Sequence, residues 1–166
     1  SATIPQAMPD GEYVYRAFSP APYSYADGTA TFEIDSLQIS DNVPYALWGS
    51  CQGGGLKPID ESLPVPADLL SLHMQSMLHY LRFYIPEGCN TLGETIQKIS
   101  FSMPESIAGV FSAAAADGSI SNVVGTGAIT VQCSIDESDH SQYALASIIP
   151  PGRTYGQDDR LRASLY

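Results

Sequence analysis

Short stretches of alternating apolar and polar residues, separated by turn-forming residues, run through most of this sequence. The clearest stretch covers residues 128–135. Successive side chains of a β-strand point to opposite faces of a sheet, so this alternation predicts a half-buried strand. The side chains that we expect to face the interior are Ile129, Val131, Cys133 and Ile135.

Similar stretches recur along the chain at intervals of roughly ten residues or a little more, which is typical of a sandwich or barrel. We therefore predict an all-β protein: a two-sheet, mostly antiparallel β-sandwich of about eight or nine short strands, transthyretin-like or immunoglobulin-like. Asp27-Gly28 predicts a turn before one of the strands. The further predicted strands are residues 12–18, 31–35, 44–49, 78–85, 98–103, 143–149 and 161–166.

Two segments have features of a helix. Asp68 has the side chain of an N-cap, and a helix over 68–84 would bury Leu69, Leu72, Met77 and Leu81. Strict alternation near its end favours a strand over 78–85, and the first part stays open between helix and bulged strand. The four alanines at 113–116 lie between glycines, so we expect a strand that enters a turn there.

The charge of the chain is strongly acidic. It carries 18 acidic and 7 basic residues, for a formal net charge of −11. Proteins bind phosphate backbones through clustered lysines and arginines, which this chain lacks, so we expect no nucleic-acid partner. With 166 residues, 44% of them hydrophobic, and no dividing linker, residues 1–166 are expected to form one domain.

The three cysteines, Cys51, Cys89 and Cys133, are an odd number and include no CxxC pair. A complete disulfide framework and a zinc site are therefore both disfavoured. One disulfide with a free thiol and three buried thiols both remain open. Cys133 lies on the apolar face of its strand, where we expect a small buried hydrophobe.

The motifs of the common catalytic and binding sites are missing. Gly53-Gly54-Gly55 lies in a long surface loop without the Lys-Ser/Thr pair that follows the glycines of a phosphate-binding loop, and no Gly-x-Ser-x-Gly motif is present. His73 and His79 are six positions apart, a spacing that suits no zinc pair, and His140 lies in an acidic stretch over 136–141. We interpret that stretch as a solvated turn rather than a calcium site. We therefore expect no catalytic, cofactor-binding or metal-binding residues.

Aromatic residues crowd the N-terminal part of the chain. They pack as cross-strand pairs in the preferred interpretation, and the alternative is a sugar-binding platform of tyrosines with Trp48, the sole tryptophan. That alternative predicts a carbohydrate-binding β-sandwich module. The residues concerned are Tyr13, Tyr15, Phe18, Tyr23, Tyr25 and Trp48.

Several segments follow one another in an order that resembles a known family. Each segment alone matches the family only loosely. The resemblance depends on the order in which the segments occur across most of residues 12–155. The segments are YRAFSP at 15–20, the strand at 29–37, PYALWG at 44–49, LHMQSMLHYLRFYI at 72–85, GETIQKISF at 93–101, GVFS at 109–112 and ALASIIPPG at 144–152.

This order resembles the N-terminal domain of the FimA/Mfa-like fimbrillins, the pilus subunits of Bacteroidales bacteria. The resemblance implies a transthyretin-like sandwich that is exported as a lipoprotein, processed by a protease, and polymerised by strand exchange. It implies a subunit or tip adhesin of a cell-surface fimbria at the outer membrane. Its partners would be other fimbrial subunits, joined head to tail, and a host protein or glycan. Family members carry a second β-domain, so this chain would be the N-terminal domain or a fragment of a longer fimbrillin. The resemblance assigns no residues to a polymerisation groove.

Overall fold

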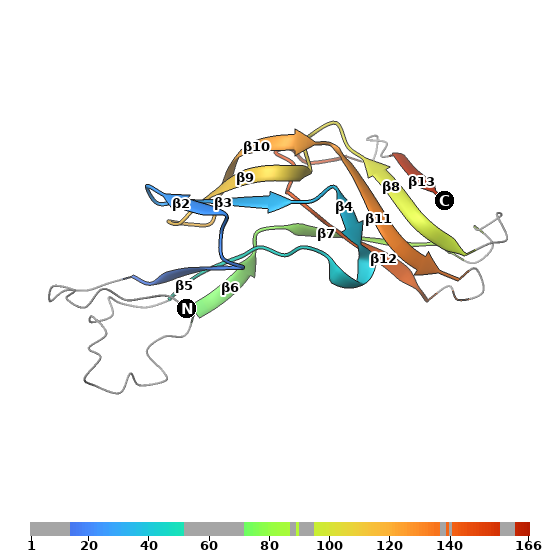
Figure 1. The fold of residues 1–166 in the computed structure, drawn as a ribbon, viewed down its shortest axis with the longest axis horizontal. Helices are drawn as coiled ribbons and strands as arrows, with labels where there is room; N and C mark the ends of the chain where they lie inside the picture. The colour runs from blue at the N-terminus through green and yellow to red at the C-terminus, as the bar shows by residue number, and fades with distance from the viewer. Residues whose placement is uncertain are drawn as a thin grey trace, which may run out of the picture.

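Strands dominate the fold, as the alternating pattern predicts. The computed structural model describes residues 14–51, 72–86, 89, 95–136, 139, 141–156 and 162–166. These residues form thirteen strands and one 3₁₀ turn, which pack as a two-layer β-sandwich (Figure 1). The elements are β1 (Arg16–Ser19), β2 (Ser24–Ala26), β3 (Thr29–Ile34), β4 (Leu37–Ile39), η1 (Ser40–Asn42), β5 (Leu47–Cys51), β6 (Leu72–Ser76), β7 (His79–Tyr84), β8 (Ile96–Ser102), β9 (Ala108–Ala114), β10 (Ile120–Thr126), β11 (Ala128–Ile135), β12 (Tyr143–Ile148) and β13 (Arg162–Leu165).

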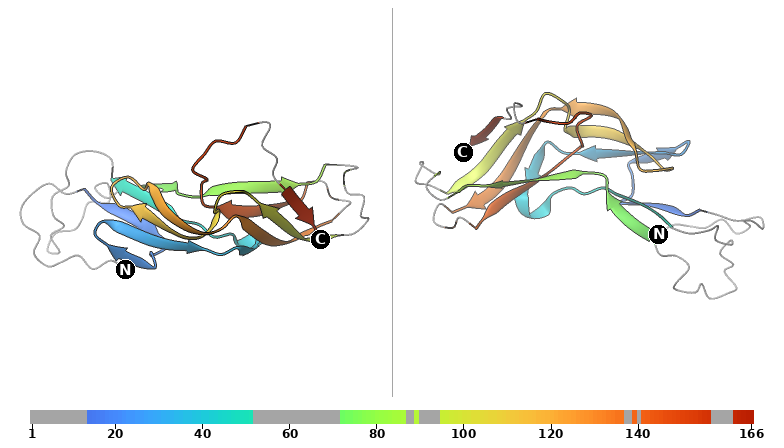
Figure 2. Two further views of the ribbon diagram at one scale, coloured as in Figure 1. Left: turned by 90° about the horizontal axis from the view of Figure 1, so that it is seen from above. Right: turned by 180° about the vertical axis from the view of Figure 1, so that it is seen from behind.

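Each layer consists of two sheets that continue into each other. One layer holds the sheets β10-β9-β3-β2 and β13-β8-β11-β4, and the other holds β1-β5-β6 and β12-β7 (Figures 1 and 2). The chain passes from sheet to sheet within a layer after short breaks: residues 35–36 between β3 and β4, 77–78 between β6 and β7, and Gly127 between β10 and β11. All strand pairs are antiparallel except β11 with β4.

Two hydrophobic clusters fill the space between the layers. The first lies where β8 and β11 pack on β7 and β12, and it includes Ile99, Phe101 and Val131. The second lies where β3 and β9 pack on β5 and the β6–β7 break, and it includes Phe32 and Phe111. The prediction for 128–135 is confirmed, because Ile129, Val131 and Ile135 are buried and Cys133 packs against the first cluster.

The number of strands exceeds the prediction of eight or nine. The structure adds β2, β4 and β10, which carry little apolar alternation, and β6 forms in the part of 68–84 that stayed open between helix and bulged strand. The helix considered for 68–84 is wrong over its described part, which forms β6 and β7; Asp68 and Leu69 lie outside the described residues. The alanine run behaves as predicted: β9 ends at Ala114 and enters a turn.

Asp27-Gly28 forms the predicted turn and creates the β2–β3 hairpin. Both residues have positive φ, 49° and 75°, and Ala26 pairs with Thr29 across them. This conformation matches a two-residue turn of the type that suits the twist of paired strands. Among the described residues, no helix is long and apolar enough to cross a membrane.

Candidate functional site

The last strand of the chain, β13, lies along the outer edge of β8 (Figure 2). It pairs antiparallel in the register Ser164 with Ser100 and Leu165 with Ile99. Tyr166 continues the pairing: its N–H donates to the Lys98 carbonyl at 2.9 Å and its carbonyl accepts from the Lys98 N–H at 3.1 Å. The Lys98 ammonium also lies 4.1 Å from the centre of the Tyr166 ring. Backbone hydrogen bonds and one cation–π contact thus hold this strand.

No side chain of β13 enters the core. Among the described strands only β2 and β13 have every residue exposed, and β2 is tied to β3 by a two-residue turn. A backbone hydrogen bond contributes about 0.5–1.5 kcal/mol net, while ordering a residue costs about 1–2 kcal/mol. The two terms nearly cancel, and the apolar burial that β13 adds is small, since its largest apolar side chain, Leu165, is still 39% exposed. The attachment of β13 to β8 is therefore weak compared with that of the interior strands.

The segment before β13 is anchored to the body of the sandwich. Arg153 Nε lies 2.8 Å from Glu105 Oε1, and the Tyr155 hydroxyl donates a hydrogen bond to Glu105 Oε2. The Arg153 guanidinium stacks over the Tyr155 ring at 4.5 Å from its centre. These contacts hold the chain at Arg153 and Tyr155 independently of the pairing of β13 with β8.

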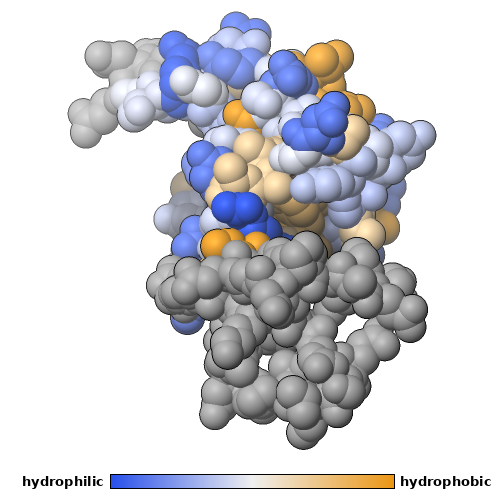
Figure 3. Space-filling view, turned by 90° about the vertical axis from the view of Figure 1, so that its left-hand side faces the viewer, coloured by the Kyte–Doolittle hydropathy of each residue, from blue (hydrophilic) through white to orange (hydrophobic). Residues whose placement is uncertain are grey.

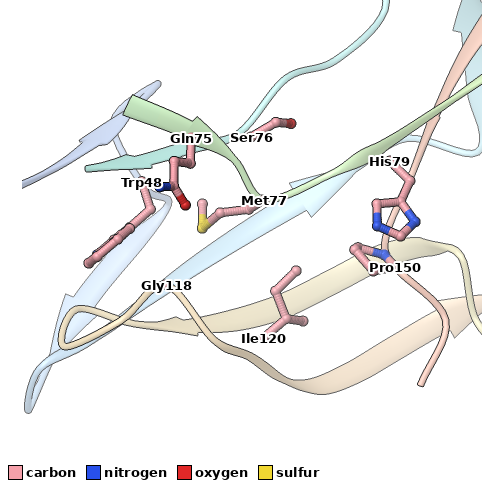
Figure 4. A pocket seen from close by; sticks show the side chains of 8 residues that line it. All are labelled: Trp48, Gln75, Ser76, Met77, His79, Gly118, Ile120 and Pro150. Atoms are coloured by element: carbon pink, nitrogen blue, oxygen red, sulfur yellow. The ribbon is translucent and has the colours of Figure 1, made fainter. Parts of the chain in front are cut away.

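A cavity of about 300 Å³ lies between the layers at β6 and the β9–β10 turn (Figure 4). Gln75 and Met77 stand side by side above Ile120, with Trp48 on one side and His79 and Pro150 on the other. Ser76 and Gly118 complete the lining. From the end of the sandwich at the left of Figure 1, the visible surface shows apolar residues in the middle with hydrophilic residues on both sides of them (Figure 3).

Trp48 is held in a fixed orientation in this cavity. Its Nε1–H donates to the Ala115 carbonyl at 3.1 Å. Gly118 packs against the indole so closely that an added Cβ would lie 2.9 Å from ring atoms Cγ and Cδ2. Ser76 holds the β6–β7 break, because its hydroxyl donates to the Leu78 carbonyl and accepts from the Leu78 N–H. The cavity is therefore preformed by the fold.

The structure separates Trp48 from the tyrosines with which the sequence suggested a platform. Among the residues that the structure describes, no tyrosine lines the cavity. The Tyr15 hydroxyl is buried and has no hydrogen-bond partner among the described residues, and Tyr23 and Tyr25 lie exposed around β2. Phe18 is paired with Trp48 across β1 and β5, as the cross-strand interpretation expects, and it also packs across the layers on Phe32 with ring centres 5.5 Å apart. Tyr13 lies outside the described residues.

The histidines and acidic residues do not converge. In the described residues no group of three or more His, Cys, Asp or Glu side chains could share a metal ion. Asp139 is engaged within its own turn, where Oδ1 accepts from the N–H and hydroxyl of Ser141 at 3.0 and 2.5 Å. His140 and Glu137 lie outside the described residues, as does the Gly53–Gly55 loop.

The three cysteines are free thiols in different surroundings. Cys51 accepts a hydrogen bond from the Tyr15 N–H, and Cys133 packs against the first cluster, where burial raises the pKa of its thiol. Cys89 is exposed. The alternative with one disulfide and the alternative with three buried thiols are therefore both wrong.

We expect Cys133 to be alkylated much more slowly than Cys89 at pH 8. The thiolate is the reactive form of a cysteine. The raised pKa lowers the thiolate fraction of Cys133, and its packing against the first cluster restricts the approach of the reagent. Iodoacetamide labelling followed by mass spectrometry measures the two rates, and the difference should vanish in denaturant. Equal rates in the folded protein would contradict the packing of Cys133 against the core.

Comparisons with protein-family models, with curated proteins and with solved structures find no match for this chain. Sequence reasoning singled out Trp48 and a strand over 161–166, but it identified neither the partners of Trp48 in the cavity nor the pairing of β13 with β8.

Proposed function

We propose that this chain is a non-enzymatic structural subunit or tip adhesin of a cell-surface fimbria, assembled by strand exchange between neighbouring subunits. In this proposal the sandwich is of the transthyretin-like type, and the edge of β8 that β13 now covers receives a strand from a neighbour. The partners are further copies or related subunits. The observation that carries the proposal is the wholly exposed β13, paired to β8 through its backbone.

The chemistry of the β8 edge suits such an exchange. Without β13, the seven-residue strand β8 would present unpaired N–H and C=O groups along one side while its other side stays paired with β11. An exposed edge of this kind pairs readily with an added strand. The core would remain intact, because Ile96, Ile99 and Phe101 are buried by β7, β11 and β12 rather than by β13.

The geometry of exchange also favours a filament. The donated strand and the receiving edge are different surfaces of the subunit, so the contact is head to tail. Such a contact repeats without closing on itself when its rotation does not complete a ring. The resemblance of the segment order to the fimbrillins supports the same assembly.

A disulfide between β13 and β8 should abolish exchange. Ser164 and Ser100 are paired residues, so a Ser100→Cys/Ser164→Cys protein in which Cys51, Cys89 and Cys133 are alanine can be locked by oxidation. We expect the reduced protein to take up a fluorescent peptide of residues 157–166 and to form SDS-resistant oligomers. The oxidised protein should do neither, and reduction should restore both.

The matched control places the same bond inside a sheet. Thr31 and Ser112 are paired residues of β3 and β9, and a Thr31→Cys/Ser112→Cys protein should exchange equally well when oxidised or reduced. The proposal would be wrong if the lock at 100–164 left peptide uptake and oligomers unchanged. It would also be wrong if neither redox state took up the peptide.

A further inference from the structure

We infer that the cavity beside Trp48 is a binding site for a single neutral sugar residue. This inference does not depend on strand exchange, because the cavity lies at β6 and the β9–β10 turn and none of its lining residues belongs to β8 or β13. The ligand class follows from the volume, the charge and the hydrogen-bonding groups of the lining.

The size of the cavity suits a small ligand. Its volume of about 300 Å³ is at the lower end of the range for ligand pockets. The space is too small for a large cofactor and accommodates one pyranose ring, with the rest of a glycan extending into solvent through the open side. Because Trp48 and the β6–β7 break are held by hydrogen bonds, little ordering is needed on binding.

The apolar part of the lining matches the C–H face of a sugar. Trp48, Met77, Ile120 and Pro150 supply this surface from four different parts of the chain. Met77 and Ile120 belong to or pack against the second hydrophobic cluster, which gives the cavity a firm floor. An aromatic ring that is flanked by polar groups can bind a ligand that has both an apolar face and hydroxyl groups.

The polar part of the lining matches hydroxyl groups. The side chains of Gln75 and His79 make no hydrogen bond to another described residue, so the Gln75 amide and the His79 imidazole are available to a ligand. A Gln amide both donates and accepts, as does a neutral imidazole, and each sugar hydroxyl also does both. A purely aliphatic ligand would leave these groups unpaired.

The charge of the site favours a neutral ligand. None of the eight lining residues is Asp, Glu, Lys or Arg. Asp117, next to Gly118, is engaged by Ser119: hydrogen bonds from the Ser119 side chain and then from its N–H lower the Asp117 pKa. The net charge of −11 repels acidic sugars, and no lysine or arginine in the lining offsets that repulsion.

Tryptophan fluorescence tests this inference directly, because Trp48 is the sole tryptophan of the chain. The full chain is titrated with glucose, galactose, mannose, N-acetylglucosamine and glucuronate up to about 100 mM, since contacts with one sugar residue give dissociation constants in the millimolar range. We expect a saturable change in Trp48 emission with at least one neutral sugar and none with glucuronate.

Substitution of the polar rim separates binding in the cavity from nonspecific quenching. Gln75→Ala and His79→Ala remove exposed side chains and should each weaken the dissociation constant about tenfold, the loss of one hydrogen bond. His73→Ala is the matched control, because His73 is an exposed histidine of β6 outside the lining. No saturable change with any neutral sugar, an equal response to glucuronate, or a response that both rim variants retain would overturn the inference.

Discussion

Replacement of Gln38 by alanine is expected to lower the free energy of unfolding by about 4 kcal/mol, although the residue is polar. Gln38 is 2% exposed, and its amide binds both backbone groups of Ser147, donating to the carbonyl at 2.8 Å and accepting from the N–H at 2.9 Å. It also donates to the Asp35 carbonyl at 3.1 Å. Ser147 is 0% exposed, so water cannot replace the lost bonds.

Urea denaturation of Gln38→Ala measures this effect, with Gln132→Ala as the control. Gln132 is exposed on β11, next to β4, and its loss should change the free energy of unfolding by no more than about 0.5 kcal/mol. The bonding described for Gln38 is contradicted if the two variants are equally stable. A large effect would show that β4 and β12, on opposite layers, are joined through a side chain.

The second large effect is expected for Phe111→Ala, at about 4 kcal/mol. Phe111 is 0% exposed and stacks on Phe32, with ring centres 5.4 Å apart and an interplanar angle of 21°. Removing the ring leaves a cavity in the second cluster, between β9 and the strands of the other layer. The cost combines lost burial and lost packing.

The neighbouring residue gives a matched control for this prediction. Val110 is 39% exposed and lies on the opposite face of β9, so Val110→Ala should cost less than about 1 kcal/mol. Both variants should unfold in urea with unchanged slope if they only alter stability. Similar costs for the two changes would argue against the inward orientation of Phe111.

Local patterns were sufficient to predict the strands with a clear inner face. The runs at 31–35 and 128–135 correspond to β3 and β11, because both sequences alternate with period two. The more continuously apolar run at 143–149 corresponds to β12, in which most residues are buried. β10 escaped prediction since Asn122 has a φ of 50° and the register shifts between Ser121 and Val124, which breaks the alternation.

β4 and the cavity show why the remainder could not be predicted. The inward residue of β4 is the polar Gln38, whose burial makes sense only beside Ser147, 109 positions away. Trp48 stood out as the sole tryptophan, but Gln75, Gly118 and Ile120 reach it from other strands and turns. Such convergence depends on register between distant segments, which no local pattern encodes.

The division of the interior into two clusters has a consequence for a subunit under assembly. The first cluster supports the β8 edge, while the second supports Trp48 and the floor of its cavity. A strand added at the β8 edge therefore need not change the shape of the cavity beside Trp48. A copy built into a fibre and a copy in solution would offer the same recognition surface, so the number of such surfaces on a fibre would grow in proportion to its length.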